Sequence, residues 1–119
     1  NERSRVSEMT GHDQPKRPVT VLRNPQHFDI RTVWIVQLFG CKTWRLGDKP
    51  AVEQPSHNCV LPNGERHVIY DGRELEAPTR MRTYNLFPGD WLLVPKGVWH
   101  ETTTTAGSVS ATLAAPEGS

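Results

Sequence analysis

Short apolar runs, separated by residues that favour turns, make up most of this 119-residue chain. The runs are rich in Val, Ile, Leu, Trp, Tyr and Thr, and ten prolines and nine glycines interrupt them. This pattern is typical of an all-β sandwich or jelly roll. No segment carries the apolar stripe of an amphipathic helix. Strands are expected over residues 18–23, 32–39, 41–46, 66–70, 73–76, 80–87, 91–94 and 108–114.

Three stretches add detail to this outline. Residues 32–39 are apolar almost throughout, which predicts a strand buried on both faces. The pair Asp71-Gly72 between two short runs predicts a two-residue hairpin turn. Residues 47–65 are rich in proline and predict a long loop. Together with residues 70–82, this loop is expected to form the mouth of any binding site.

Packing preferences assign several side chains to the core or the surface. Cys41 stands inside a strand pattern and is expected to be a small buried thiol. Large aromatic side chains are usually buried, which places most of the four tryptophans in the core. These are Trp34, Trp44, Trp91 and Trp99. The histidines without a partner at ligand spacing are expected to be exposed: His12, His57 and His67.

The length of the chain indicates one small domain. We expect a jelly roll over residues 17–114, an N-terminal arm over residues 1–16 and a frayed tail over residues 115–119. The arm holds several basic residues and is expected to be a solvated, mobile segment or a patch that binds a partner. The first residue is Asn rather than Met, so flanking domains could be missing from this sequence. A homodimer also stays open.

Charge and composition exclude several classes of function. Lys plus Arg is 14 and Asp plus Glu is 13, which argues against nucleic acid as an obligatory partner. No apolar run approaches the ~20 residues of a membrane span, and no signal peptide is visible. The two cysteines form no framework of disulfides. We therefore expect a cytoplasmic protein, in a reducing compartment.

Two distant stretches carry metal-binding chemistry. His27 and Asp29 lie two residues apart, so they share a face if the chain after Pro25 is extended. Such a pair alone is more often a hydrogen-bonded couple at the surface. The second stretch, Gly89 to His100, reads as turn, strand and turn before the chain re-enters the sheet and presents His100. Two imidazoles and one carboxylate are the ligands of non-haem Fe(II) oxygenases. If the three residues converge, they predict an oxygen-activating enzyme.

The downstream stretch resembles the second motif of the cupin superfamily. In that motif Gly is followed by five residues, Pro, one residue, Gly, two residues and His, and the pattern is complete from Gly89 to His100. The upstream stretch resembles the JmjC-type hydroxylases of this superfamily, most closely their ribosomal-oxygenase branch. The residues that carry this likeness are His27, Asp29, the apolar run 33–39, Gln37, Gly40, Lys42, Trp44 and Arg45.

The resemblance covers about residues 24–114 and implies a fold, a cofactor and an activity. The fold would be a double-stranded β-helix, the cupin jelly roll. His27, Asp29 and His100 would bind Fe(II), with 2-oxoglutarate as co-substrate and O2 as oxidant. The reaction would be hydroxylation of an unactivated C–H bond in an amino-acid side chain. That side chain would belong to a protein, a peptide or a free amino acid.

Three residues are candidates for binding the far carboxylate of 2-oxoglutarate. Lys42 stands where the resembling family keeps its basic residue, and Arg45 is a bidentate alternative. Both could instead be ordinary charges of an edge strand. Thr104 lies four residues after His100, hence on the same face, and could donate its hydroxyl. It could equally be a simple strand former.

Two other functions remain open at this point. The first is a metal-dependent cupin enzyme that does not use 2-oxoglutarate. Most such enzymes take several histidines from their first motif, whereas His27 stands alone here. The second is a catalytically silent jelly-roll module that binds a ligand or partner. The small size of the chain favours this module, and the intact His27, Asp29 and His100 argue against it.

Overall fold

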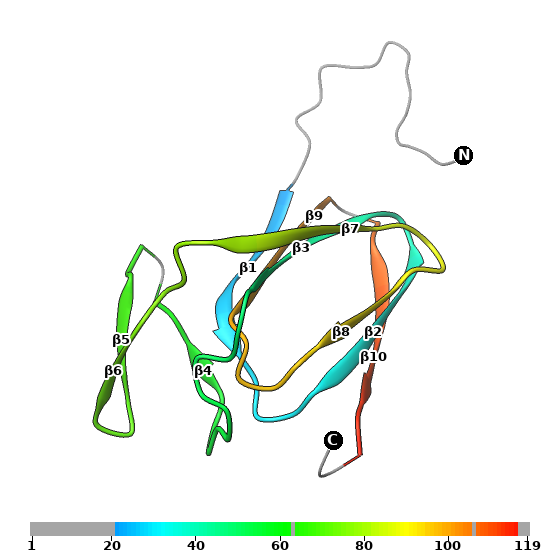
Figure 1. Ribbon diagram of the computed structural model, residues 1–119. Helices are drawn as coiled ribbons and strands as arrows, with labels where there is room; N and C mark the ends of the chain where they lie inside the picture. The colour runs from blue at the N-terminus through cyan, green and yellow to red at the C-terminus, as the bar shows by residue number, and fades with distance from the viewer. Residues whose placement is uncertain (1–20, 63, 106, 117–119) are drawn as a thin grey trace.

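Two facing β-sheets and a hairpin beside them form the fold (Figure 1). The computed structural model describes residues 21–62, 64–105 and 107–116. The predicted arm over residues 1–16, the start of the predicted strand 18–23 and the last three residues lie outside these ranges. The strands are β1 (Val21–Phe28), β2 (Val33–Phe39), β3 (Lys42–Gly47), β4 (Cys59–Val60), β5 (His67–Tyr70), β6 (Arg73–Glu76), β7 (Met81–Leu86), β8 (Trp91–Val94), β9 (His100–Thr105) and β10 (Val109–Ala114).

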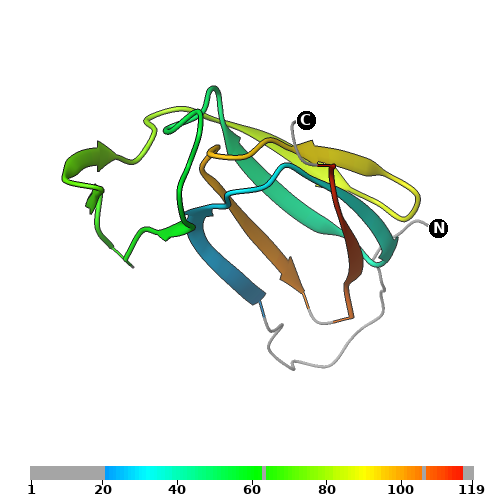
Figure 2. The same ribbon diagram turned by 90° about the horizontal axis from the view of Figure 1, so that it is seen from below.

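The strand order confirms the predicted double-sheet jelly roll. One sheet has the order β4-β1-β9-β3-β7, the facing sheet has the order β10-β2-β8, and β5 pairs with β6. All of these pairs are antiparallel. Figure 2 shows the hairpin projecting to one side of the two sheets. No helix in the described ranges has the length and hydropathy needed to cross a membrane.

A bulge in β1 decides which of its side chains face the space between the sheets. Between Asn24 and His27, β1 advances three residues while its partner β9 advances two. Pro25, which lacks a backbone N–H, stands at this irregularity, as is common for proline in a sheet. Residues three apart in a regular strand face opposite sides. The extra residue lets both Asn24 and His27 line the same cavity.

Apolar side chains pack into two clusters on either side of β9. The central cluster lies between the sheets and contains Ile35, Trp44, Leu46, Leu86, Leu92, Val94 and Val98. The lateral cluster joins the five-stranded sheet to the hairpin and contains Phe28, Cys59, Leu61, Tyr70, Leu75, Ala77 and Trp99. The turn of the hairpin is the predicted one, because Asp71 and Gly72 both have positive φ, 49° and 77°.

The prediction that residues 32–39 are buried on both faces is wrong. Ile35 and Gln37 are buried, whereas Trp34 and Leu38 are more than 40% exposed. Trp34 and Trp91 contact each other on the outer face of the three-stranded sheet, with ring centroids 6.2 Å apart. Of the four tryptophans, only Trp44 and Trp99 are therefore in the core. A continuous apolar run shows that neither face of a strand carries charge. It does not show that other parts of the protein pack on both faces.

Three smaller expectations also differ from the structure. Cys41 is exposed, because it belongs to the turn between β2 and β3 rather than to a strand. The predicted loop 47–65 contains β4, whose Val60 pairs with His27 of β1. Ala115, predicted as the start of the frayed tail, is buried, and its N–H donates to the carbonyl of Thr32. His57 and His67 are exposed, as predicted.

Gly97 connects three segments near the start of β9. Its N–H donates to the carbonyl of Asp29, and its own carbonyl accepts from the N–H of Ala51. Its φ is 75°, and a Cβ at this position would collide with the carbonyl oxygen of Val52. Only glycine satisfies both conditions.

Gly97→Ala is therefore expected to destabilise the fold by more than the positive φ alone costs. That cost is about 1–3 kcal/mol, and the collision adds to it. Thermal unfolding followed by circular dichroism measures the loss. Gly72→Ala is the matched control, since Gly72 has a similar φ and nothing within 4 Å of its added Cβ. Equal losses for the two variants would show that the Val52 contact relaxes at no cost.

Candidate metal centre

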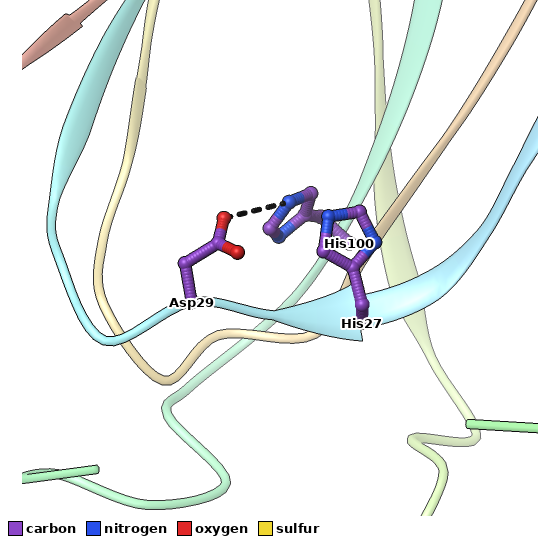
Figure 3. A group of neighbouring side chains, drawn as sticks. All are labelled: His27, Asp29 and His100. Carbon is purple, nitrogen blue, oxygen red and sulfur yellow. Dashed lines mark ion pairs between the residues drawn. The ribbon is translucent and has the colours of Figure 1, made fainter. Parts of the chain in front are cut away.

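Three side chains that are distant in sequence converge between the sheets. His27 is the second-last residue of β1, Asp29 comes directly after the end of that strand, and His100 is the first residue of β9. Their ligand atoms all lie within 4.8 Å of one another, and Asp29 Oδ2 is 3.6 Å from His100 Nε2. Figure 3 shows the three side chains pointing toward one another. Two metal–ligand bonds of about 2.0–2.2 Å span at most about 4.4 Å, so a small movement of the side chains lets one ion reach all three groups.

Strand pairing and alternation produce this convergence. His27 and His100 are direct partners across the antiparallel pair β1–β9, and their ring centroids are 4.2 Å apart. The residues next to the ligands, Phe28 and Trp99, point the other way and stack edge-to-face in the lateral cluster at 4.9 Å. Each ligand therefore has a buried aromatic neighbour in sequence that fixes the backbone beside it.

Backbone carbonyls fix the tautomer of both imidazoles. His27 Nδ1 lies 2.8 Å from the carbonyl oxygen of Pro25, and His100 Nδ1 lies 3.0 Å from that of Val98. A carbonyl oxygen only accepts, so each neutral ring must carry its proton on Nδ1. Each Nε2 then keeps its lone pair for a metal ion. In metal sites the second ring nitrogen usually has such a partner.

Electrostatics favour the neutral, metal-binding form of His100. Burial lowers the pKa of this imidazole below its ordinary value, and the nearby His27 lowers it further. The hydrogen bond to Val98 and the charge of Asp29 act in the opposite direction, but burial is the largest cause. The ring is 4% exposed, so neutral His100 can bind a cation without first losing a proton at pH 7.

The three candidate metal ligands line a cavity of about 310 Å³ between the sheets. Lys42 and Thr104 lie in the same cavity and are direct partners across β3 and β9. Thr104 Oγ1 donates to the carbonyl of Cys41. Arg45 lies on the opposite face of β3, where it pairs with Glu101 at 3.0 Å. The structure therefore brings Lys42 and Thr104, but not Arg45, to the cavity of the metal ligands.

Lys42 places a positive charge in the wall of the cavity. Its Nζ lies 5.2 Å from the ring centroid of Trp44, and burial lowers its pKa from 10.5. Among the described residues no carboxylate pairs with it. A partly buried cation without an anionic partner is costly, so a bound carboxylate would stabilise it. The cavity thus combines a metal face with a cationic site, which fits a bidentate ligand that ends in a carboxylate.

Comparison with known proteins identifies the family. A family model described as the JmjC domain matches residues 19–117. The chain belongs to the JmjC domain family. A mouse relative named Ribosomal oxygenase 2 is 30% identical over 83 residues, which cover 70% of this chain and 15% of that protein. The Bacillus subtilis protein YxbC, described as uncharacterized, is 28% identical over 93 residues, which cover 73% of this chain and 28% of that protein.

These matches confirm two of the sequence predictions. The chain is a JmjC domain of the cupin superfamily, similar to the ribosomal-oxygenase branch, and its jelly roll is the fold of that family. The family is one of 2-oxoglutarate-dependent oxygenases. This JmjC domain spans well under a third of the length of either relative.

Sequence reasoning missed part of the cavity wall of this JmjC domain. The polar residues that it did not identify are Asn24, Ser108, Ser110 and Thr112. In β10, polar Ser110 and Thr112 alternate with apolar residues, and this alternation was the available signal. The prediction that residues 47–65 and 70–82 form the mouth is wrong for this cavity, since none of them lines it.

Proposed function

We propose that this JmjC domain is an Fe(II)- and 2-oxoglutarate-dependent oxygenase that hydroxylates an unactivated C–H bond of an amino-acid side chain. The observation that carries the proposal is the convergence of His27, Asp29 and His100 within 4.8 Å, with both Nε2 lone pairs available. Membership of the family supports the same reaction class.

The three ligands have distinct tasks. His27 and His100 donate Nε2 lone pairs, and Asp29 contributes negative charge that favours a divalent cation. Because only three protein groups bind, open coordination positions remain for the co-substrate and O2. Iron in such a site supplies oxygen activation coupled to the oxidative decarboxylation of 2-oxoglutarate. The Pro25 and Val98 carbonyls keep the two rings in the orientation that the ion requires.

The opposite end of the cavity would bind the far carboxylate of 2-oxoglutarate. Lys42 provides the charge, and the face of Trp44 holds its ammonium in place. Thr104 lies directly opposite Lys42 and already donates to the Cys41 carbonyl. This hydrogen bond ties β9 to the residue next to Lys42, so it helps to hold the strand end that carries the ammonium.

The size of the cavity limits the substrate. At about 310 Å³ it lies at the lower end of the range of ligand pockets, which is roughly 300–1,000 Å³. A bound 2-oxoglutarate would fill part of this volume, and the substrate would have to use the remainder. We infer that the substrate presents a single amino-acid side chain from outside. The name of the mouse relative, Ribosomal oxygenase 2, is consistent with a substrate that belongs to the ribosome.

Spectroscopy of the anaerobic Fe(II) protein tests the reaction class. Adding 2-oxoglutarate is expected to produce a visible charge-transfer band, and air is expected to yield succinate. Metal binding without the band would favour a cupin enzyme that does not use 2-oxoglutarate, and the lack of tight metal binding would favour a silent module. Mass spectrometry of extracts treated with active protein would then search for a product that gains one oxygen.

Raising the pH is expected to weaken binding of 2-oxoglutarate. Burial lowers the pKa of Lys42, so its ammonium loses its proton at a lower pH than an exposed lysine. A bound carboxylate favours the charged form, so the complex holds this proton more tightly than the free protein. The affinity for 2-oxoglutarate should therefore fall as the pH rises through the pKa that Lys42 has in the free protein.

Titrations with 2-oxoglutarate between about pH 7 and about pH 10 measure this dependence. Lys42→Arg is the matched variant, because a guanidinium stays charged over that whole range. Its profile should be flatter than that of the wild type. Identical profiles for the two proteins would show that residue 42 does not carry the pH dependence.

A further inference from the structure

Gln37 is the most completely hydrogen-bonded buried side chain near the cavity. It is 0% exposed and lies on the inward face of β2. The two hydrogens on its Nε2 are shared among three acceptors, which are the carbonyl oxygens of Phe39 at 2.7 Å and Gly40 at 3.2 Å and Ser108 Oγ at 2.9 Å. Its Oε1 accepts from Ser110 Oγ at 3.0 Å. An amide with no exposure and four partners is held in one orientation.

The two carbonyls determine which end of the amide is which. Carbonyl oxygens only accept, so the group that faces Phe39 and Gly40 must be the NH2. The opposite amide orientation would place an oxygen against two oxygens. The amide nitrogen therefore faces Ser108, and the amide oxygen faces Ser110.

This orientation gives the two serine hydroxyls opposite roles. Ser108 Oγ accepts from Gln37, so its own proton remains for another acceptor. Ser110 Oγ donates its proton to Gln37 Oε1, so toward any other group it can act only as a hydrogen-bond acceptor. Both serines line the cavity with Lys42. The wall thus presents one hydroxyl donor and one hydroxyl acceptor at fixed positions.

Close backbone packing brings the donor to the end of the cavity that holds Lys42. Gly40 has a φ of 68°, and a Cβ there would lie 3.1 Å from the Cα of Ser108. Lys42 follows Gly40 by two residues, and Gln37 binds both this turn and Ser108. The contact between the two turns therefore holds Ser108 beside the strand end that carries Lys42.

We propose that Gln37 is a positioning residue that turns the Ser108 hydroxyl toward the carboxylate bound by Lys42. Ser108 is then a second donor to that carboxylate, and Ser110 contributes none. This inference rests on the proposed binding of 2-oxoglutarate. It assigns Gln37 a role in co-substrate affinity that its place in the core of the sheet does not by itself require.

The test compares metal affinity and 2-oxoglutarate affinity in four variants. Ser108→Ala is expected to weaken 2-oxoglutarate binding about tenfold, because a hydrogen bond to a charged group is lost. Ser110→Ala is expected to weaken it less than twofold. Gln37→Glu replaces the NH2 by an acceptor, which draws the Ser108 proton away from the cavity, so a similar tenfold loss is expected. The Gln37→Glu/Ser108→Ala double variant should lose little more than either single variant.

Binding is measured by titrating 2-oxoglutarate into the Mn(II)-loaded protein by calorimetry, with Mn(II) affinity measured separately. Mn(II) affinity should be unchanged in Ser108→Ala. Thr43→Val is the matched control, since it removes a hydroxyl next to Lys42 that bonds Asn85 on the outer face.

The outcomes separate this inference from the proposed function. Wild-type protein that binds Mn(II) but not 2-oxoglutarate overturns both. Wild-type protein that binds 2-oxoglutarate while Ser108→Ala binds it equally well overturns only the role of Ser108. Equal losses in Ser108→Ala and Ser110→Ala overturn the assigned hydroxyl directions. If Gln37→Glu fails to fold, the contrast between Ser108→Ala and Ser110→Ala still tests which of the two hydroxyls donates to the carboxylate.

Discussion

His100→Ala is expected to abolish metal binding and turnover while leaving most of the fold in place. Removing a group that merely orients a metal ligand typically costs about 10–100-fold in affinity, and removing one of three ligands should cost more. We therefore expect Fe(II) or Mn(II) affinity to fall by at least about 100-fold. Succinate formation in air should fall below detection, since His27 and Asp29 alone cannot hold the ion in the required geometry.

The control for this variant is His67→Ala. His67 is also a histidine in a β-strand, but it is exposed on the hairpin and lies near Glu74 and Glu76. Metal affinity and turnover should be unchanged in it. Asp29→Asn serves as a second variant in case the buried His100 position does not tolerate alanine, because Asp29 is partly exposed. Unchanged turnover in His100→Ala would reject the assignment of the metal site.

Lys42→Met is expected to weaken 2-oxoglutarate binding strongly while leaving metal affinity unchanged. Hydrogen bonds to charged groups contribute about 1.5–3 kcal/mol, which corresponds to roughly a 10- to 150-fold rise in Kd. Methionine keeps much of the apolar stem, so the packing against Trp44 is largely retained. Titration of the anaerobic Fe(II) protein, followed by its charge-transfer band, measures the change.

Arg45→Met is the matched control, since it removes a cation from the opposite face of the same strand. It should lose only the surface ion pair with Glu101, which is worth about 1 kcal/mol or less. A large loss of 2-oxoglutarate affinity in Arg45→Met, with Lys42→Met unaffected, would reverse the assignment of the two residues.

Local sequence signals predicted most of the strands but not their surroundings; the predicted list ended the first strand at residue 23, short of Phe28, and had no range for β9. The β5–β6 turn followed from Asp71-Gly72, because a type I′ turn needs two residues with positive φ and this pair tolerates it. The same kind of reasoning failed for residues 32–39, since an apolar run does not say which faces are covered. It also missed β4, a two-residue strand that exists only because β1 lies beside it.

The metal site shows the same division. The spacing of His27 and Asp29 predicted that both would lie on one face, and the structure places both on the cavity. The partners of the two imidazoles could not be predicted, because the Pro25 and Val98 carbonyls reach the rings only through local chain geometry. Ser108 and Gln37 were equally hidden, since their meeting depends on the contact between two turns that are far apart in sequence.

Sequence alone determined the alternation of side chains, the turns and the choice of the three candidate ligands, because these depend on short-range backbone geometry and on residue chemistry. Only the tertiary structure decided that β1 carries a bulge, that Lys42 rather than Arg45 faces the ligands, and that Gln37 orients two hydroxyls. Those outcomes depend on strand pairing across long separations, where one shifted residue moves every following side chain to the other face of the sheet.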